Sequence, residues 1–144
     1  MNIGIVYKIA SFNKSILFRE ATSSDKNFAL ITNALGCFSH LGLRNMGPQK
    51  VWLSTNGCTS YSTFVHEFLH AYGLNHEHER PDRDEYIEVL WDNIIKKWAY
   101  AYNKCKNCET YQVPYDGKSC MHYHPWGFSI GNGKLTMQSK VKKE

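Results

Sequence analysis

The sequence of 144 residues lacks the features that mark several broad classes of protein. No apolar run approaches the roughly 20 residues that a membrane-spanning helix needs. The N-terminal stretch MNIGIVYKIASF has no charged leader, long apolar segment or cleavage motif, so we do not interpret it as a signal peptide. The net charge is +4, but no basic run carries interleaved aromatic residues, which argues against a nucleic-acid partner. Internal repeats and low-complexity tracts are also absent.

Cysteine occurs in an odd number, so the five cysteines cannot all pair within the chain. Cys105 and Cys108 have the CxxC spacing, but a zinc ribbon needs a second such pair, and the sequence has none. A thioredoxin-like site needs a βαβ setting, which the surrounding sequence does not predict. We interpret this pair as a local loop closure or as two separate thiols.

The apolar pattern predicts strands in the first part of the chain. A chain of this length suggests one domain, and it can bury about 68–70% of the surface of its unfolded state. Strand-like runs occupy residues 15–20, 28–32 and 50–54. Polar and glycine-containing segments separate these runs and are predicted to be turns or loops.

A helix is predicted over residues 63–74, where apolar residues recur at helical spacing. Thr59 or Ser60 could cap the N-terminus of this helix, because both side chains carry a hydroxyl that can accept a backbone hydrogen bond. Gly73 could end the helix, because glycine adopts the left-handed conformation that commonly follows a last helical turn.

The second half of the chain is predicted to contain less regular structure. A short strand is expected at 85–90, and a second helix is expected over about 93–103. After Cys105 the chain is rich in glycine, proline, tyrosine and histidine, so an irregular segment is expected there. This order of elements indicates the α+β fold class.

The stretch HEFLHAYGLNHEHERPDRD contains three histidines whose spacing predicts a metal site. His66 and His70 are four residues apart, so a helix places them on one face, where two imidazoles can bind one zinc ion. His76 would lie about 240° around the axis from His70 if the helix continued. Gly73 allows the chain to turn sharply and bring His76 back to the same ion.

Three histidine ligands leave one position of a tetrahedral zinc ion open, which is typical of catalytic sites. A water molecule at that position becomes acidic enough to ionise near neutral pH. Glu67 follows His66 directly and could take the proton of that water. The HExxH pattern alone could arise by chance, but Gly73 and His76 at the correct offsets strengthen the prediction. His78 has no such geometric requirement, and we interpret it as a surface histidine or one that supports the site.

Several motifs in this sequence resemble those of the astacin family of zinc endopeptidases, within the metzincin clan. The longest is the zinc helix with its continuation, residues 66–84. SCMHY at 119–123 resembles the Met-turn of the family, and GFSIGNGKLTM at 127–137 resembles the segment that follows. GCFSHLG at 36–42 and NGC at 56–58 resemble the upstream edge strand and loop. The resemblance covers roughly residues 15–137.

The resemblance assigns roles to the residues that match these motifs. It implies that His66, His70 and His76 bind one zinc ion per chain, and that Glu67 acts as general base and then as general acid. It implies that Tyr123 is a fifth ligand that leaves the metal when substrate enters and then hydrogen-bonds the developing oxyanion. The substrates implied are peptides or proteins.

Supporting residues follow from the same resemblance. Met121 would form a hydrophobic floor under the metal, and Glu77 would contact the mature N-terminus from outside the ligand shell. Cys37 and Cys58 would form a disulfide, which indicates an oxidising compartment and a secreted, extracellular protein. An edge strand is expected to bind extended peptide by strand addition. Its residues would be Cys37, Phe38, Ser39 and His40.

The fold implied by the resemblance is a metzincin, or zincin-like, α+β domain. A small twisted mixed sheet would lie over the active-site helix, and the C-terminal half would be mostly irregular. The N-terminal subdomain is expected at about residues 1–75 and the C-terminal subdomain at about 76–144, with the catalytic domain incomplete at both ends. The predicted function is zinc-dependent peptide-bond hydrolysis. Two alternatives remain open, a catalytically inert zinc-containing peptide-binding relative and a small structural zinc domain.

Overall fold

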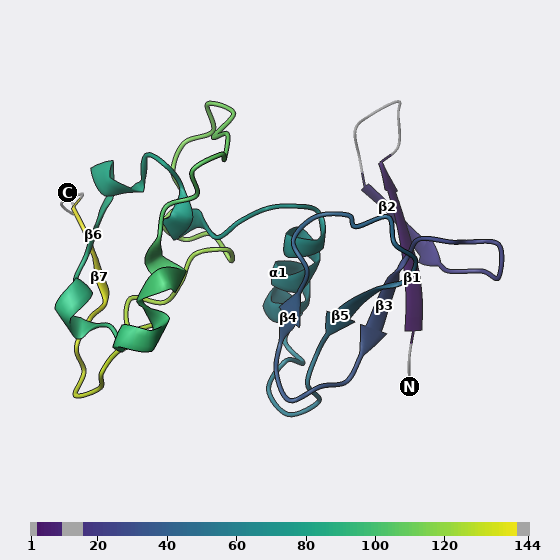
Figure 1. Ribbon diagram of the computed structural model, residues 1–144, viewed down its shortest axis with the longest axis horizontal. Coiled ribbons are helices and arrows are strands. Elements are labelled where there is room, and N and C mark those ends of the chain that lie inside the picture. The colour runs from purple at the N-terminus through teal and green to yellow at the C-terminus, as the bar shows by residue number, and fades with distance from the viewer. Residues whose placement is uncertain (1–2, 10–15, 141–144) are drawn as a thin grey trace. The chain divides into compact units, whose positions relative to one another are not determined.

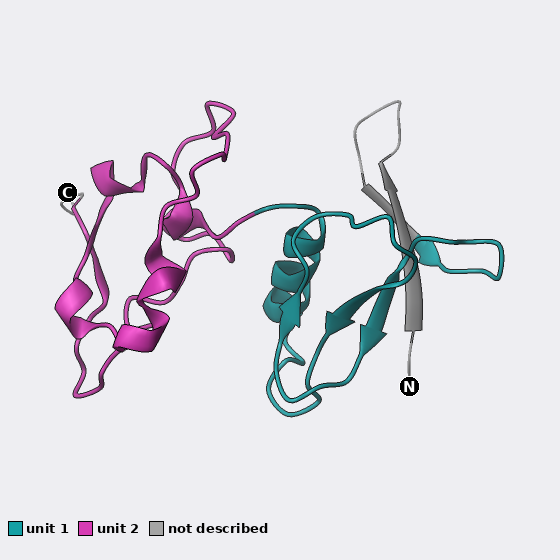
Figure 2. Cartoon of the chain, in the orientation of Figure 1, with its two compact units in different colours: residues 1–74 teal, residues 75–144 magenta. Residues whose placement is uncertain are grey.

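The computed structural model of the chain describes the backbone of residues 3–9 and 16–140, and the side chains of residues 19–140. The chain forms two compact units, residues 1–74 and residues 75–144 (Figure 2). The first unit contains a sheet and an α-helix, whereas the second is built mainly of loops and 3₁₀ turns (Figure 1). This combination confirms the predicted α+β class.

The first unit is built on a five-stranded mixed sheet with the strand order β2-β1-β3-β5-β4. Strands β3 and β5 are parallel, and the other neighbouring pairs are antiparallel. Strand β4 is the last strand in this order, so its side opposite β5 is an open edge among the residues that the structure describes (Figure 1). The bounds are β1 Ile3–Ile9, β2 Ile16–Glu20, β3 Ala29–Thr32, β4 Phe38–Ser39 and β5 Gln49–Trp52.

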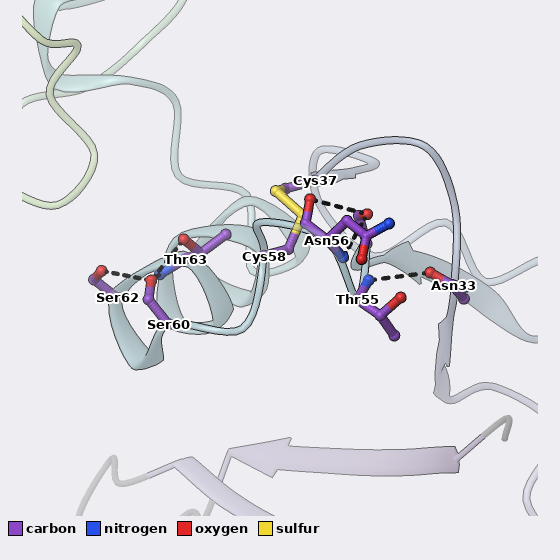
Figure 3. Close-up of a disulfide and its surroundings, with 9 residues drawn as sticks. Asn33, Cys37, Thr55, Asn56, Cys58, Ser60, Ser62 and Thr63 are labelled. Carbon is purple, nitrogen blue, oxygen red and sulfur yellow. Dashed lines mark hydrogen bonds between the residues drawn. A yellow bond between two sulfur atoms is a disulfide. The ribbon is translucent and has the colours of Figure 1, made fainter.

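Helix α1 spans Tyr61–Ala71 and begins at the N-cap Ser60. The Ser60 hydroxyl accepts a hydrogen bond from the backbone N–H of Thr63 at 3.1 Å, which satisfies one of the donors that a helix start leaves unpaired (Figure 3). Gly73 follows the helix with a φ of +101°, a backbone conformation that residues other than glycine rarely adopt. A Cβ atom at Gly73 would lie in ordinary van der Waals contact with Gly42, at 3.7 Å from its Cα atom, so the positive φ is what favours glycine there.

The core of the first unit forms where α1 packs against the sheet. Its fully buried members are Ala29 and Val51 from the strands and Phe68 and Ala71 from the helix. These residues leave water on folding, which is the main favourable contribution to the stability of the unit.

A disulfide between Cys37 and Cys58 connects the start of β4 to the loop before α1 (Figure 3). Its sequence separation is 21 residues, so it restricts the intervening loop and strand β5 in the unfolded chain. The cysteine pairing that the family resemblance implies is therefore present in the structure.

The second unit has a small antiparallel sheet and a separate core. The core consists of Ile87, Ile94, Tyr102 and Met137. The Tyr102 hydroxyl donates to the backbone oxygen of Gly127, and this contact holds a distant loop against the core. The strands are β6 Ile87–Val89 and β7 Met137–Ser139, and the 3₁₀ helices are η1 Glu77–Glu79, η2 Arg83–Glu85, η3 Trp91–Asn93 and η4 Lys96–Tyr102.

The second helix, expected over about residues 93–103, is present as a shorter 3₁₀ helix and not as an α-helix. Residues 94 and 95 are not helical, and η4 at Lys96–Tyr102 is a 3₁₀ helix. Ile94 instead forms an isolated antiparallel bridge with Ser129, and no side chain caps the start of η4. A 3₁₀ helix has poorer hydrogen-bond geometry than an α-helix, so its formation depends more on tertiary contacts. Within the described part of the chain, no helix has the length and apolar character needed to cross a membrane.

Candidate metal centre

Helix α1 presents His66 and His70 on the same face. Their rings lie 4.6 Å apart between centroids and are nearly perpendicular, at 88°. Their Nε2 atoms are separated by 3.1 Å, so the two nitrogens approach a common point. This is the arrangement expected for residues one helical turn apart. Glu67 lies next to His66 on the same helix and is only 4% exposed.

The chain reverses direction after α1, and the reversal brings His76 to the other two histidines. The backbone N–H of Gly73 donates to the oxygen of His70 at 2.8 Å, and that of Leu74 donates to the oxygen of Leu69 at 3.0 Å. One ligand atom from each of His66, His70 and His76 then lies within 4.8 Å of the others. All three side chains are partly exposed.

The hydrogen bonds around these imidazoles fit a metal ion bound by the ring nitrogens. His70 Nδ1 lies 2.8 Å from the backbone oxygen of Leu74, so this nitrogen carries the proton and Nε2, which faces His66, is the acceptor nitrogen. His76 Nδ1 lies 3.4 Å from a carboxylate oxygen of Glu79. Partners of this kind fix the tautomer and ring orientation of metal-binding histidines. Three neutral imidazoles are also a typical donor set for zinc.

Glu79 is held as a carboxylate beside His76. Its Oε2 atom also accepts the backbone N–H of His76 at 3.0 Å. Burial of Glu79 raises its pKa, but its hydrogen bonds with His76 act in the opposite direction, and the pKa lies below its usual value. Glu79 therefore stays ionised and can support the His76 ring. Glu79 was not predicted from the sequence, although its position three residues after His76 is a signal of such a contact.

Tyr123 lies against the third histidine. The centroid of its ring is 4.5 Å from that of His76 and 4.0 Å from that of His78. Met121 is 3% exposed, and its backbone oxygen accepts the N–H of Glu77 at 2.9 Å. The Met-turn segment is therefore attached to the chain directly after His76.

The carboxylate of Glu77 accepts hydrogen bonds from two other residues of the second unit. Its Oε1 atom accepts hydrogen bonds from Arg80 Nη1 at 3.1 Å and from the backbone N–H of Asp116 at 2.9 Å. These contacts join the segment after His76 to the segment before the Met-turn. The contact with a mature N-terminus that the resemblance implies for Glu77 stays a prediction.

His78 is fully buried, so the interpretation of it as a surface histidine is wrong, whereas a supporting position fits its contacts. Its Nε2 atom lies 2.9 Å from the backbone oxygen of Ala101 and must donate to it. Its buried Nδ1 atom has no hydrogen-bond partner among the described residues. Burial lowers the pKa of His78 to about 4 despite the hydrogen bond to Ala101, so the ring is neutral at pH 7.

The expected peptide-binding edge strand is shorter in the structure than the sequence motif. Only Phe38 and Ser39 belong to β4, whereas Cys37 and His40 flank it. Of the remaining cysteines, Cys105 and Cys108 form a disulfide, as the loop-closure interpretation allowed, and Cys120 lies outside both disulfides.

Comparison with known proteins identifies the family. The family model described as astacin, a family of peptidases, matches residues 6–144. The chain belongs to the astacin family. Its relatives include zinc metalloproteinase nas-7 of Caenorhabditis elegans, which is 40% identical over 129 residues, corresponding to 88% of this chain and 33% of the relative. High choriolytic enzyme 1 of Oryzias latipes is 38% identical over 78% of this chain and 41% of the relative.

A solved astacin structure supports the same assignment. High choriolytic enzyme 1 from medaka, described as a hatching enzyme and zinc protease, matches with a TM-score of 0.79 and 34% identity, covering 84% of this chain and 60% of that chain. The metzincin-type α+β fold is therefore confirmed. The curated astacin relatives are longer, and the chain spans 33% of nas-7 and 41% of high choriolytic enzyme 1.

Proposed function

We propose that this chain is the catalytic part of a zinc-dependent endopeptidase that hydrolyses peptide bonds in proteins. The proposal rests mainly on the ligand atoms of His66, His70 and His76, which lie within 4.8 Å of one another on partly exposed side chains. Three protein ligands leave one zinc position open for water or substrate, as in catalytic sites. The zinc metalloproteinases among the relatives support this assignment.

Zinc bound by the three histidines would supply an acidic water and would polarise the substrate carbonyl. Glu67 takes the proton of the attacking water and later delivers it to the leaving amine. The Tyr123 hydroxyl would also be a zinc ligand before substrate binds, and it donates a hydrogen bond to the oxyanion that develops on the substrate. Met121 forms the apolar floor, and Glu79 keeps His76 in the tautomer that the metal requires.

The substrate is an extended peptide that adds to the open edge of strand β4. Strand addition uses main-chain hydrogen bonds, so it accepts many sequences and leaves specificity to side-chain pockets. Two disulfides, Cys37–Cys58 and Cys105–Cys108, indicate that the protein works in an oxidising, extracellular compartment.

The test is the variant Glu67→Gln, which preserves the shape of the side chain but removes its basicity. Zinc content, measured by metal analysis, should stay at one ion per chain. Cleavage of a peptide library should fall by about 10²–10⁴-fold, the usual contribution of a general base. Glu109→Gln is a matched control, because Glu109 is exposed, and it should leave cleavage unchanged. Unchanged cleavage in Glu67→Gln contradicts the mechanism, and peptide binding without any cleavage by the unmodified chain identifies an inert relative.

A further inference from the structure

The disulfide between Cys105 and Cys108 lies beside the chain segment that carries the third histidine. The backbone N–H of Cys105 donates to the oxygen of Glu79 at 2.6 Å. The side-chain amide of Asn75 donates to the sulfur of Cys108 at 3.1 Å. Asn75 directly precedes His76, and Glu79 follows His76 by three residues. The loop that the disulfide closes therefore contacts the chain on both sides of His76.

The contacts of this loop affect the position of the His76 ring. Glu79 accepts the backbone N–H of His76 at 3.0 Å, and its carboxylate lies 3.4 Å from His76 Nδ1. A partner of this kind fixes the orientation of a metal-binding histidine. His76 also lies beyond the end of helix α1 and beyond the reversal at Gly73, so the helix alone does not orient it. A loop that holds Asn75 and Glu79 therefore also positions His76.

The segment that leads into the disulfide is attached by other contacts. His78 donates to the backbone oxygen of Ala101 at 2.9 Å. The buried guanidinium of Arg83 donates to the backbone oxygen of Tyr102 at 2.7 Å. Neither contact involves a cysteine. Opening the disulfide would therefore loosen residues 105–108 and leave the core of the second unit in place.

The disulfide is accessible to a small thiol. Both cysteines are partly exposed, and the two residues between them, Lys106 and Asn107, are exposed. Thiol–disulfide exchange requires that one protein sulfur leaves as a thiolate, and a nearby positive charge stabilises a thiolate. Lys106 carries such a charge within the loop. The pair therefore has the exposure and the charge that favour exchange.

We propose that the Cys105–Cys108 disulfide positions His76 for zinc, and that its reduction by a dithiol weakens zinc binding. A thiolate of the dithiol attacks one protein sulfur to form a mixed disulfide, and the second thiol of the reagent then displaces that sulfur. Two electrons and two protons pass to Cys105 and Cys108, which become thiols, while the dithiol becomes a disulfide. This inference rests on the proposed function, because it takes His76 as a ligand of the catalytic zinc ion.

The first experiment measures the zinc affinity of the double variant Cys105→Ser, Cys108→Ser by titrating the metal-free protein with zinc in the presence of a competing chelator. The variant should bind zinc roughly tenfold more weakly than the unmodified chain, the lower end of the loss expected when the partners of a metal-binding histidine are disturbed. Asn75→Ala should change the affinity in the same direction. Asn107→Ala is the matched control, because Asn107 is exposed within the same loop, and its zinc affinity should equal that of the unmodified chain.

The second experiment tests the dependence on reduction. The unmodified chain is treated with dithiothreitol, and the reagent is removed by gel filtration without oxygen before zinc is added, because dithiols themselves bind zinc. The zinc affinity should fall to that of the double variant and should recover after reoxidation. The same treatment of the double variant should leave its affinity unchanged, which excludes an effect of the Cys37–Cys58 disulfide.

A double-mutant cycle separates the positioning of His76 from a general loss of order. In a His76→Ala background, zinc binding is weaker, and removal of the disulfide should cause no further loss, because the ring on which the disulfide acts is missing. A similar loss of zinc affinity in both backgrounds would show that the disulfide only stabilises the fold, and this result would overturn the proposal.

Equal zinc affinity of the unmodified chain and the double variant would also overturn the proposal, and it would leave the peptidase function intact. Weaker zinc binding by the double variant, together with no peptide cleavage by the zinc-loaded unmodified chain, rejects the peptidase function but supports the positioning role of the disulfide.

Discussion

Tyr115 and His122 form a chain of hydrogen bonds that ends on the backbone of Tyr123. His122 Nδ1 lies 2.7 Å from the Tyr123 oxygen and must donate to it. His122 Nε2 therefore accepts, and the Tyr115 hydroxyl donates to it at 2.6 Å. Burial raises the pKa of Tyr115 above its ordinary value, and the charge of Glu77 raises it further. The folded protein thus keeps Tyr115 protonated, so that its hydroxyl can donate to the imidazole that precedes Tyr123.

The raised pKa of Tyr115 predicts a loss of stability in alkali. In the unfolded chain Tyr115 ionises near its ordinary pKa of about 10, whereas the folded chain retains the proton. Above about pH 10 the folded state binds more protons than the unfolded state, so the free energy of unfolding falls as pH rises, by at most about 1.4 kcal/mol per pH unit from this residue. Urea unfolding at about pH 9 and pH 11 measures the effect.

The control for this measurement is Tyr115→Phe, which cannot ionise. The variant should be less stable at neutral pH, because the hydrogen bond to His122 is lost. Its stability should then decline less between the two pH values than that of the unmodified protein. Equal declines in the two proteins would mean that Tyr115 does not contribute to the alkaline transition.

Single residues could be grouped from the sequence when their spacing had a geometric consequence. His66, His70, Gly73 and His76 could be grouped from their offsets alone, because a helix and one reversal determine where they lie. The burial of His78 could not be predicted in this way. It depends on Ala101 and Tyr123, which are 23 and 45 positions further along the chain.

Helix α1 is the element that orients the metal centre, and a single residue specifies each of its ends. Ser60 caps the N-terminus, and its hydroxyl also lies 2.8 Å from that of Thr63 (Figure 3). Gly73 allows the reversal at the other end, with a φ of +101°. His66 and Glu67 lie within four residues after Thr63, so fraying of the first helical turn would displace their side chains.

The capping role of Ser60 predicts that Ser60→Ala lowers the free energy of unfolding by about 1 kcal/mol. Ser60→Asp should retain most of the stability, because aspartate caps helices and its charge is favourable at an N-terminus. Thr59→Ala is the matched control, since Thr59 is exposed and was the other candidate cap in the sequence. Guanidinium unfolding curves compare the variants. A larger loss in Thr59→Ala than in Ser60→Ala would contradict the assignment of the cap.

Elements with strong local signals were predictable, and those that depend on distant contacts were not. Predicted strands at 28–32 and 50–54 correspond to β3 and β5 within a few residues, and the predicted helix at 63–74 corresponds to α1. Strand β7 was missed because its residues pair with β6, which lies about 50 positions earlier. The apolar residues near η4 have helical spacing, but in the packed structure the segment forms the tighter 3₁₀ helix.

At the scale of the whole molecule, each compact unit contains one disulfide, and the two differ greatly in span. Cys37–Cys58 joins residues 21 positions apart and encloses strands β4 and β5 of the first unit. Cys105–Cys108 joins residues only three positions apart in the second unit, where Asn75 donates to the Cys108 sulfur at 3.1 Å. In the chain-entropy account, a longer enclosed loop gives a larger reduction of freedom in the unfolded state.

This difference in span predicts unequal losses when the disulfides are removed. The double variant Cys37→Ala, Cys58→Ala should lower the free energy of unfolding by roughly 3 kcal/mol, whereas Cys105→Ala, Cys108→Ala should lower it by roughly 2 kcal/mol or less. Urea unfolding followed by circular dichroism measures both, and the unmodified protein in a reducing agent should lose the sum. Since Cys37–Cys58 also holds the start of β4 beside the loop that leads into α1, only its removal should weaken peptide binding at the edge strand. Equal losses from the two double variants would show that local contacts, rather than loop length, determine the stabilising effect of these disulfides.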